Sequence, residues 1–357
     1  MRRIICDIIN ADSDFHVADV SADGEDAYNK IKTTSYDLIV LDMILPKMTG
    51  LEVLKRLSAD KVPFNVILIS SSLKEDADST IKAIELGALD FVVKPIRSTP
   101  ETREVFARDI MNAMKACIKT VSIRKGVFPK SEVPKTPAQP VEFKSSPEPA
   151  KTSNVSFSGA DGSGKIKKII ALACSTGGPQ ALHTFVPMLP SNLPVPVVIV
   201  QHMPEGFTAS LAARLNQISS INVKEAEDKE VFKPGLVYVT PGGKHMEIYE
   251  NASHQPYCHL SDDPPVNSLK PCADVMYRSL TKSTLDEIIC VVLTGMGSDG
   301  SEGIKNLKQY KKTYVISQEA STCVVYGMPK AVEQGGLSDE VVPLKSVANS
   351  IVKKLGG

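Results

Sequence analysis

The sequence predicts an α/β protein with two doubly wound, mainly parallel sheets that are joined by a flexible linker. Short apolar runs alternate with amphipathic stretches in both halves of the chain, which is the pattern of parallel sheets covered by helices. Between the halves, six of the 24 prolines fall within the 21 residues 129–149. Such a segment has too few apolar side chains to offset its ordering entropy. We therefore expect domains at 1–120 and 166–355 and an extended tether over 121–165.

In the first half, the apolar runs 37–42, 66–70 and 90–94 are typical of strands that are buried on both faces of a parallel sheet. A helix is predicted between the second and third runs, with Gly87 as its end, because glycine tolerates the left-handed conformation that follows many helices. A closing helix is predicted after the third run. The apolar positions at helical spacing are Ile81, Ile84 and Ala88 in the first helix, and Phe106, Ile110, Ala113 and Cys117 in the second.

The second half repeats this alternation with different residues. Strands are predicted at 168–173, 195–201, 288–294 and 313–317, and helices at 207–217, 272–283 and 302–310. Three short runs, 235–239, 245–249 and 257–260, predict a small antiparallel insertion.

Composition excludes several classes of function. Lys and Arg total 41 and Asp and Glu total 41, so no net charge attracts the chain to nucleic acid or to an anionic membrane. No helix-turn-helix or basic stripe is present either, so we expect no nucleic-acid partner. The seven cysteines form no C-x-x-C pair, which argues against a disulfide framework or a structural zinc site. No apolar run approaches the ~20 residues of a membrane helix. We expect a cytoplasmic protein without direct membrane insertion.

Three reactive side chains follow predicted strands of the second half. Ser175 begins the sequence S-T-G-G-P, His202 ends the second strand, and Asp299 lies in T-G-M-G-S-D-G after the third. Working residues of open α/β sheets gather outside the carboxyl ends of the strands. Ser, His and Asp are the residue types of a nucleophile, a general base and a carboxylate that orients the base.

Each of these residues also has a plainer interpretation. The S-T-G-G-P segment is equally typical of a phosphate-binding loop or a tight turn, a single histidine is often a structural hydrogen bonder, and Asp299 can be a helix cap. Cys174 is a second candidate nucleophile beside Ser175. Adjacent residues leave a strand in different directions, so only one of the two can face the base.

The second half resembles the catalytic domain of the chemotaxis protein-glutamate methylesterases (CheB), which is Rossmann-like. The matching motifs are 175–179 (STGGP), 201–204 (QHMP) with 206–208 (GFT), 241–243 (PGG) with His245, 294–297 (TGMG) with 299–300 (DG), and 323–329 (CVVYGMP). The resemblance implies that Ser175 is the nucleophile, His202 the base and Asp299 its orienter. It also implies that the Met296 amide serves the oxyanion hole, with Thr176 in support.

The same resemblance implies an activity. We expect hydrolysis of glutamate methyl esters on the cytoplasmic helices of methylated chemoreceptors, which gives glutamate and methanol. Deamidation of receptor glutamines is expected too, since both reactions pass through an acyl-enzyme. No cofactor is expected for catalysis. A non-catalytic receiver-scaffold that binds receptors or the kinase is the alternative, and the intact Ser, His and Asp set argues against it.

The first half resembles a response-regulator receiver, which has a flavodoxin-like fold. Asp42 matches the phospho-acceptor, while Ser70 and Lys94 match the residues that sense the phosphoryl group. The peptide bond from Lys94 to Pro95 is commonly cis in that family. The resemblance implies a chemotaxis histidine kinase as partner, Mg²⁺ for phosphorylation, and an unmodified receiver that covers the esterase site.

One part of the receiver pattern is missing. Receivers open with a strand that ends in two acidic residues which hold Mg²⁺, whereas residues 1–10 here already resemble the helix that follows this strand. Asp7 and Asp12 match helical or loop positions, which leaves Asp42 as the one carboxylate of an incomplete metal site. The lost central strand should expose a sheet edge. Either the true start lies upstream of Met1, which we favour, or the receiver is impaired.

Overall fold

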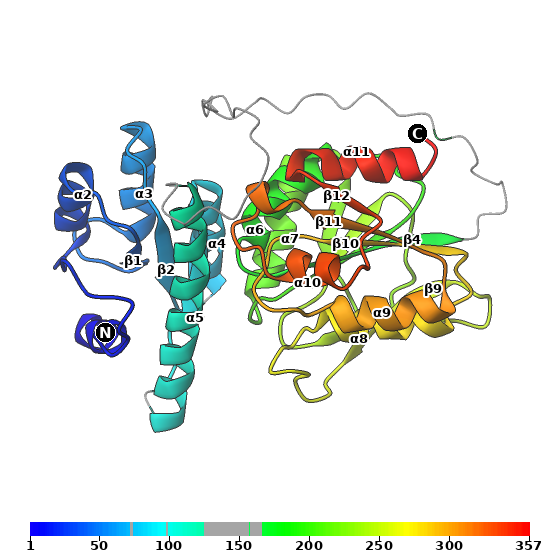
Figure 1. Cartoon of the computed structure of the whole chain (residues 1–357), viewed down its shortest axis with the longest axis horizontal. Helices are drawn as coiled ribbons and strands as arrows, with labels where there is room; N and C mark the ends of the chain where they lie inside the picture. Colours follow the sequence, from blue (N-terminus) through cyan, green and yellow to red (C-terminus); the bar gives the residue numbers. More distant parts are fainter. Residues whose placement is uncertain (72–73, 98, 125–156, 158–165) are drawn as a thin grey trace.

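The computed structural model describes residues 1–71, 74–97, 99–124, 157 and 166–357, which form two α/β domains (Figure 1). Most of the predicted linker lies outside these residues. The elements of the first domain are α1 (Arg2–Asn10), α2 (Gly24–Thr33), β1 (Ile39–Asp42), α3 (Gly50–Ala59), β2 (Val66–Ser70), α4 (Lys74–Glu85), β3 (Asp90–Val93) and α5 (Pro100–Arg124).

The first domain is a parallel sheet with the strand order β1-β2-β3, as the three apolar runs predicted. Residues of α1 and α5 form the apolar core on one face, and residues of α2, α3 and α4 form it on the other. Helix α4 ends just before Gly87, whose φ of +113° is strained for any residue with a side chain.

Strand β1 lies at the edge of this sheet, as expected for a receiver pattern that lacks its first strand. Among the described residues β1 pairs with β2 alone. All five residues of β2 are buried, whereas three of the four in β1 are only partly buried. Ile5 and Ile8 of α1 pack into the same cluster as Val40, so the first helix covers part of the apolar edge.

The second domain contains a parallel sheet with the strand order β12-β11-β10-β4-β5-β7-β6. Its strands are β4 (Lys168–Cys174), β5 (Val197–Gln201), β6 (Asn222–Glu225), β7 (Leu236–Val239), β10 (Glu287–Val292), β11 (Thr313–Gln318) and β12 (Glu340–Val342), and a separate hairpin is formed by β8 (His245–Glu250) and β9 (Pro256–Ser261). Its helices are α6 (Gly178–Phe185), α7 (Phe207–Ile218), α8 (Ala273–Ser279), α9 (Ser301–Tyr310), α10 (Met328–Gln334) and α11 (Leu344–Lys354), with short 3-10 turns η1 (Val186–Met188), η2 (Leu280–Lys282) and η3 (Ala320–Thr322).

The antiparallel insertion is smaller than the sequence predicted. Hairpin β8–β9 is antiparallel, but β7 pairs in parallel with both β5 and β6 inside the main sheet. Three of the four residues of β7 are buried, which is the pattern of an interior strand rather than of a half-exposed hairpin. The short strands β6 and β12 were not predicted.

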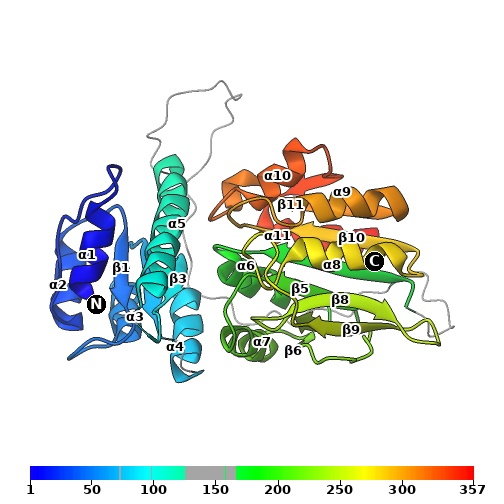
Figure 2. The same ribbon diagram turned by 90° about the horizontal axis from the view of Figure 1, so that it is seen from below.

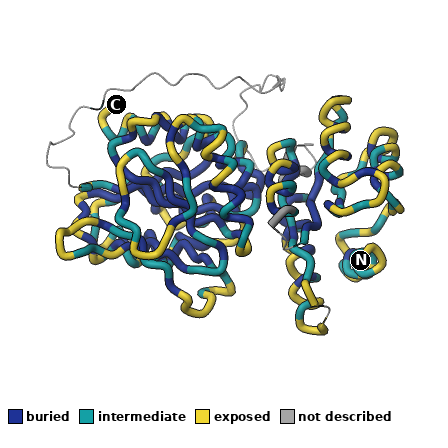
Figure 3. The backbone as a smooth tube through the Cα atoms, turned by 180° about the vertical axis from the view of Figure 1, so that it is seen from behind, coloured by how far each residue is buried: buried dark blue, intermediate teal, exposed yellow. Residues whose placement is uncertain are grey.

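Helices cover both faces of the second sheet, which makes it doubly wound as predicted. Residues of α6, α7 and α11 form the core on one face, while α8, α9, α10 and the β8–β9 hairpin close the other (Figure 1). Figure 3 shows that the buried backbone follows the central strands, with the exposed residues on the outer surfaces of the helices. None of the described helices is long and apolar enough to cross a membrane.

The two domains pack against each other through α4, β3 and α5 of the first (Figure 2). The ring of Phe91 in β3 stacks on Phe207 of α7, with the ring centroids 4.6 Å apart. The Arg214 guanidinium donates from Nε to Glu85 Oε2 at 3.0 Å and from Nη2 to Glu85 Oε1 at 2.5 Å. Apolar residues of α4 join the core of the second domain, so the interface is continuous with both cores.

Candidate active site

Ser175, His202 and Asp299 come together at the carboxyl ends of three neighbouring strands. Strand β4 lies between β10 and β5 in the sheet. Ser175 directly follows β4, His202 directly follows β5, and Asp299 lies in the loop between β10 and α9. The order of the strands along the chain does not predict this arrangement. Strand β10 is far from β4 in sequence, but the crossover connections of the sheet bring it next to β4, with which it pairs in parallel.

His202 and Asp299 form a buried pair. Nε2 of His202 lies 2.7 Å from Oδ2 of Asp299, and the two side chains are only 10% and 3% exposed. Burial opposes ionisation of Asp299, but the hydrogen bond and charge of His202, with the amides of Ala273 and Asp274, lower its pKa to about 2. The carboxylate is therefore charged at neutral pH and can stabilise a protonated imidazole.

Asp299 is also a helix cap, but not of the helix that follows it. The backbone N–H of Ala273 donates to Oδ2 at 2.6 Å, and that of Asp274 donates to Oδ1 at 3.0 Å. These amides belong to the first turn of α8, and the Cys272 thiol donates to the same Oδ1 at 3.1 Å. Both interpretations of Asp299 thus hold at once, since one carboxylate pairs with the histidine and caps α8.

Ser175 lies in a tight turn that glycines make possible. Its own N–H donates to Thr294 O at 3.0 Å, and Gly178 N–H donates back to Ser175 O at 2.7 Å. Gly177 has a φ of +74°, which a residue with a side chain rarely adopts. A Cβ on Gly295 would lie 2.9 Å from Ser175 Cβ, so the loop after β10 approaches the serine closely because it has no side chain there.

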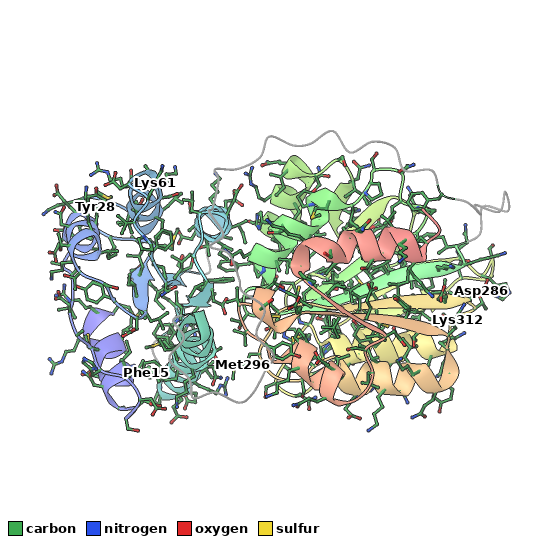
Figure 4. The ribbon with its side chains drawn as sticks, turned by 45° about the horizontal axis from the view of Figure 1, so that its top comes forward. Phe15, Tyr28, Lys61, Asp286, Met296 and Lys312 are labelled. Carbon is green, nitrogen blue, oxygen red and sulfur yellow. The ribbon has the colours of Figure 1, made fainter. Side chains whose placement is uncertain are left out.

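Two backbone N–H groups beside Ser175 are available to an oxyanion. Neither Thr176 nor Met296 donates its N–H to an acceptor within the described residues. The Met296 side chain is 43% exposed. Met296 is labelled in Figure 4, close to α5 of the first domain.

Gln201 belongs to the candidate site, and the sequence analysis did not assign it a role. Its Oε1 accepts from the Cys174 thiol at 3.0 Å, and its Nε2 donates to Ser175 O at 3.0 Å and to His202 O at 3.1 Å. One side chain therefore holds the backbone carbonyl groups of both Ser175 and His202 in place. Its place directly before His202 was the only signal in the sequence.

Cys174 does not face the histidine. Its side chain is fully buried, its thiol donates to Gln201, and burial raises its pKa. A thiol whose pKa is raised by burial forms little thiolate, which is the reactive species. This geometry favours Ser175 over Cys174 as the nucleophile.

The first domain covers the mouth of this site. One pocket is lined by Ser175, Thr176, His202 and Met296 from the second domain together with residues of β3 and α5 from the first. Among the latter, Asp90 lines the pocket beside Thr176, and its Oδ1 accepts from the Phe91 N–H at 2.9 Å. Burial raises the pKa of Asp90 to about 6, against the opposing hydrogen bonds from the Phe91 N–H and Thr176. A substrate must displace these groups to reach Ser175.

The predicted phospho-acceptor lies at the carboxyl end of β1. Asp42 Oδ1 accepts from Lys94 Nζ at 2.6 Å and from the Ile44 N–H at 2.9 Å. Ser70 ends the neighbouring strand, and its hydroxyl lies 2.8 Å from the Thr80 hydroxyl. The bond from Lys94 to Pro95 is trans, contrary to the expectation, and the cis bond among the described residues is Lys270–Pro271. Lys94 reaches Asp42 without it.

The described residues do not complete a magnesium site around Asp42. No group of three His, Cys, Asp or Glu ligand atoms within 4.8 Å of one another includes it in this part of the chain. Asp12 instead pairs with Lys115 of α5 at 2.5 Å, and Asp7 is exposed on α1. Mg²⁺ requires several oxygen ligands, and Asp42 contributes one carboxylate that is already paired with Lys94.

A buried cluster of Cys272, Asp274 and Asp299 does have the spacing of metal ligands. Both oxygens of Asp299 and one oxygen of Asp274 already accept N–H groups. The cluster is therefore a hydrogen-bonding unit that holds two helix ends together.

Comparison with known proteins agrees with this geometry. The family model described as CheB methylesterase matches residues 170–351, and the response regulator receiver domain model matches residues 1–104. The chain belongs to the CheB methylesterase family. It is similar to the protein-glutamate methylesterase/protein-glutamine glutaminase of Halalkalibacterium halodurans, with 38% identity over 99% of this chain and 95% of that protein.

A similar relative and a solved structure extend the comparison. The protein of the same name from Desulfotalea psychrophila is 38% identical over 98% of this chain and 94% of its own length. The crystal structure of the Thermotoga maritima CheB methylesterase catalytic domain is 40% identical with a TM-score of 0.51, and covers 52% of this chain and 98% of that chain. The second domain of this CheB family member therefore has the fold of a methylesterase catalytic domain, and the first is a receiver.

Proposed function

We propose that this chain hydrolyses glutamate methyl esters on the cytoplasmic helices of chemoreceptors and deamidates receptor glutamines through a serine acyl-enzyme. The observation that carries the proposal is the ionised Asp299 paired with His202 at the strand ends where Ser175 lies. The two substrates are taken from the names of the full-length relatives, which are called protein-glutamate methylesterase/protein-glutamine glutaminase: a methyl ester of glutamate and the side-chain amide of glutamine.

The reaction follows from the positions of the groups. Ser175 Oγ attacks the ester carbonyl carbon and gives its proton to His202, whose Nδ1 is the nitrogen not paired with Asp299. The oxyanion accepts from the N–H groups of Met296 and Thr176. Methanol leaves with the proton from the imidazolium, and a glutamyl ester of Ser175 remains.

Water completes the cycle. His202 removes a proton from the water that attacks the acyl-enzyme, and Ser175 recovers its proton as the glutamate carboxylate leaves. With a glutamine substrate the same steps release ammonia in place of methanol. Asp299 stays ionised throughout and stabilises the imidazolium in both halves of the reaction.

Regulation is proposed to pass through the receiver. In this proposal the receiver spans 1–120, the linker 121–165 and the catalytic domain 166–355. A chemotaxis histidine kinase supplies the phosphoryl group to Asp42, and Ser70 and Lys94 sense it. The covered pocket supports this regulation, because movement of β3 and α5 is needed to admit a receptor helix. Because the proposed partners are a kinase and the cytoplasmic helices of receptors, the proposal includes a cytoplasmic location. Mg²⁺ is expected to assist only where further carboxylates join Asp42.

Methanol release from receptors that carry labelled methyl esters tests the proposed reaction. The wild-type chain should release methanol, and Ser175→Ala should lower the rate by about 10⁴-fold because no acyl-enzyme can form. Ser253→Ala, at an exposed turn serine near the β8–β9 hairpin, is the matched control and should keep full activity. No methanol release from the wild-type chain would favour a non-catalytic scaffold, and an undiminished rate in Ser175→Ala would return Cys174 as the candidate nucleophile. Conversion of receptor glutamine to glutamate, followed by mass, tests deamidation in the same samples.

A further inference from the structure

Beyond the triad, we infer that Asp274 is a positioning residue. It holds the loop that carries Asp299, so that the Asp299 carboxylate stays within hydrogen-bond distance of His202. The inference rests on the proposed function, since it assigns a role toward one member of the proposed triad. Asp274 lies in the first turn of α8 and is only 3% exposed. It does not line the pocket and so does not touch substrate.

The two carboxylates cap each other's helices. Asp299 precedes α9 and accepts the N–H groups of Ala273 and Asp274 at the start of α8. In return, Asp274 Oδ1 accepts the N–H of Gly300 at 3.0 Å and of Gly303 at 2.6 Å at the start of α9. Four backbone N–H groups at the two helix starts are thereby satisfied by two side chains. Any shift of one helix start moves the other.

The loop between β10 and α9 needs such an anchor. Gly297 and Gly300 have φ values of +84° and +93°, and glycines in this region lose more conformational entropy on folding than other residues. The same loop carries the Met296 amide and the Asp299 carboxylate. Gly300 itself has no side chain with which to cap α9. The Asp274 carboxylate supplies the missing cap and fixes the loop directly beside Asp299.

The close contact of the two helices supports the same role. A Cβ on Gly303 would lie 2.8 Å from Asp274 Cα and 2.9 Å from Tyr277 Cβ. The start of α9 therefore sits directly on the backbone of α8 at Asp274. No larger residue fits between them without separating the two helix starts.

The charge of Asp274 adds a second effect. Burial raises the pKa of Asp274, and the nearby Asp299 carboxylate raises it further. Within the described part of the chain, Asp274 forms an ion pair with Arg278 at 3.7 Å, and the Arg278 side chain is 48% exposed. A neutral cap would avoid the repulsion between the two carboxylates. The negative charge of Asp274, however, adds to that of Asp299 and stabilises a protonated His202. An asparagine at position 274 would keep the hydrogen bonds but not this charge effect.

Kinetics of the full-length chain with methylated receptors test this role. Asp274→Ala should lower kcat by up to about 10²-fold with KM unchanged, since misplacement of a catalytic group by about 1 Å costs that much. Asp274→Asn keeps an oxygen acceptor for Gly300 and Gly303 and should restore kcat to within a few-fold of wild type. Arg278→Gln, which leaves those two hydrogen bonds intact, is the matched control and should keep wild-type kcat.

A double-mutant cycle separates positioning from general stability. In an Asp299→Ala background, Asp274→Ala should add little further loss of kcat, because the group that it positions is already absent. The same fold-loss in both backgrounds would overturn the inference, as would wild-type kcat in Asp274→Ala. Wild-type kcat in Asp299→Ala would instead overturn the proposed triad itself, so the two failures are distinguishable.

Circular dichroism of each variant shows whether it folds. If Asp274→Ala does not fold, Asp274→Thr takes its place, because its hydroxyl can accept from only one of the two amides. A folded threonine variant should have a lowered kcat and an unchanged KM. Wild-type kcat in that variant would overturn the inference.

Discussion

Nε2 of His202, and not Nδ1, faces the Asp299 carboxylate, with 2.7 Å between Nε2 and Asp299 Oδ2. The tautomer of His202 is therefore set by an acceptor that is itself fixed by N–H donors at the start of α8. Nδ1 is left as the basic nitrogen for Ser175. The following predictions depend on this pair and on the receiver that covers it.

Asp299→Asn should lower both activity and stability. The amide nitrogen would face backbone N–H donors or the His202 ring, so one hydrogen bond is lost and the tautomer of His202 is no longer fixed. We expect kcat to fall by about 10⁴-fold. The free energy of unfolding should fall by about 1–3 kcal/mol. Methanol release and urea unfolding measure the two effects. Asp286→Asn, at an exposed residue shown in Figure 4, is the control. A variant with full activity would leave Asp299 as a cap only.

Cys174→Ala should retain activity within a few-fold of wild type. The thiol is buried and contacts Gln201, so its removal costs one weak hydrogen bond and a small packing volume. The matched comparison is Ser175→Ala in the same assay. Loss of methanol release in Cys174→Ala, with activity kept in Ser175→Ala, would make the thiol the nucleophile.

Phe91→Ala should raise the basal activity of the unphosphorylated chain several-fold. The ring stacks on Phe207, and its loss weakens the docked arrangement in which β3 and α5 cover the pocket. Arg214→Ala should give a smaller rise, since the ion pair with Glu85 is partly exposed and such pairs contribute about 0.2–1 kcal/mol. Methanol release before and after phosphodonor treatment measures both. A fall in basal activity in Phe91→Ala would mean that the contact supports catalysis.

Asp90→Asn should lower basal activity at neutral pH. The docked state raises the pKa of Asp90 to about 6, so it binds a proton more tightly than the undocked state, whose ordinary carboxyl pKa is 3.8. Docking is therefore favoured below about pH 4 and penalised progressively up to about pH 6, with the full penalty above it. A neutral amide removes that penalty and tightens the cover.

The ratio of wild-type to Asp90→Asn activity measures this effect, because the pH dependence of the catalytic step is the same in both chains and cancels in the ratio. It should exceed one at pH 7.5, decrease as the pH falls below about 6, and approach one toward pH 4. The same ratio for Asp109→Asn shows whether any effect belongs to Asp90 alone, since Asp109 lines the same pocket and burial also raises its pKa. A ratio that does not change with pH would remove Asp90 from the regulation of docking.

The chain of 357 residues should respond little to a small phosphodonor such as acetyl phosphate. Asp42 and Lys94 are paired, but the described residues bring no second carboxylate to Asp42, so Mg²⁺-dependent phosphoryl transfer is poorly supported. A chain extended upstream that supplies an acidic pair should be stimulated several-fold, and Asp42→Ala in it should remove the stimulation. Strong Mg²⁺-dependent activation of the 357-residue chain would mean that Asp7 or Asp12 moves to complete the site.

The sequence predicted most of the sheets because strands and helices are read from local periodicity. The runs that became β2, β4 and β10 are apolar except at one end residue each, as expected of strands that are covered on both faces. Periodicity does not state which strands pair. The run that became β7 is short and lies next to the two hairpin runs in sequence, and only its parallel partners β5 and β6 assign it to the main sheet. Strands β6 and β12 have four and three residues, too few to show a period.

The sequence by itself determined the residue types of the site, because Ser175, His202 and Asp299 each follow a strand and motifs are contiguous. The tertiary structure decided what surrounds them. The hydrogen bond of Gln201 to Ser175, the mutual capping by Asp274 and Asp299, and the position of Asp90 near Thr176 join segments that are distant in sequence or in different domains. Such contacts depend on how elements pack, and packing is a property of the whole chain rather than of any window along it.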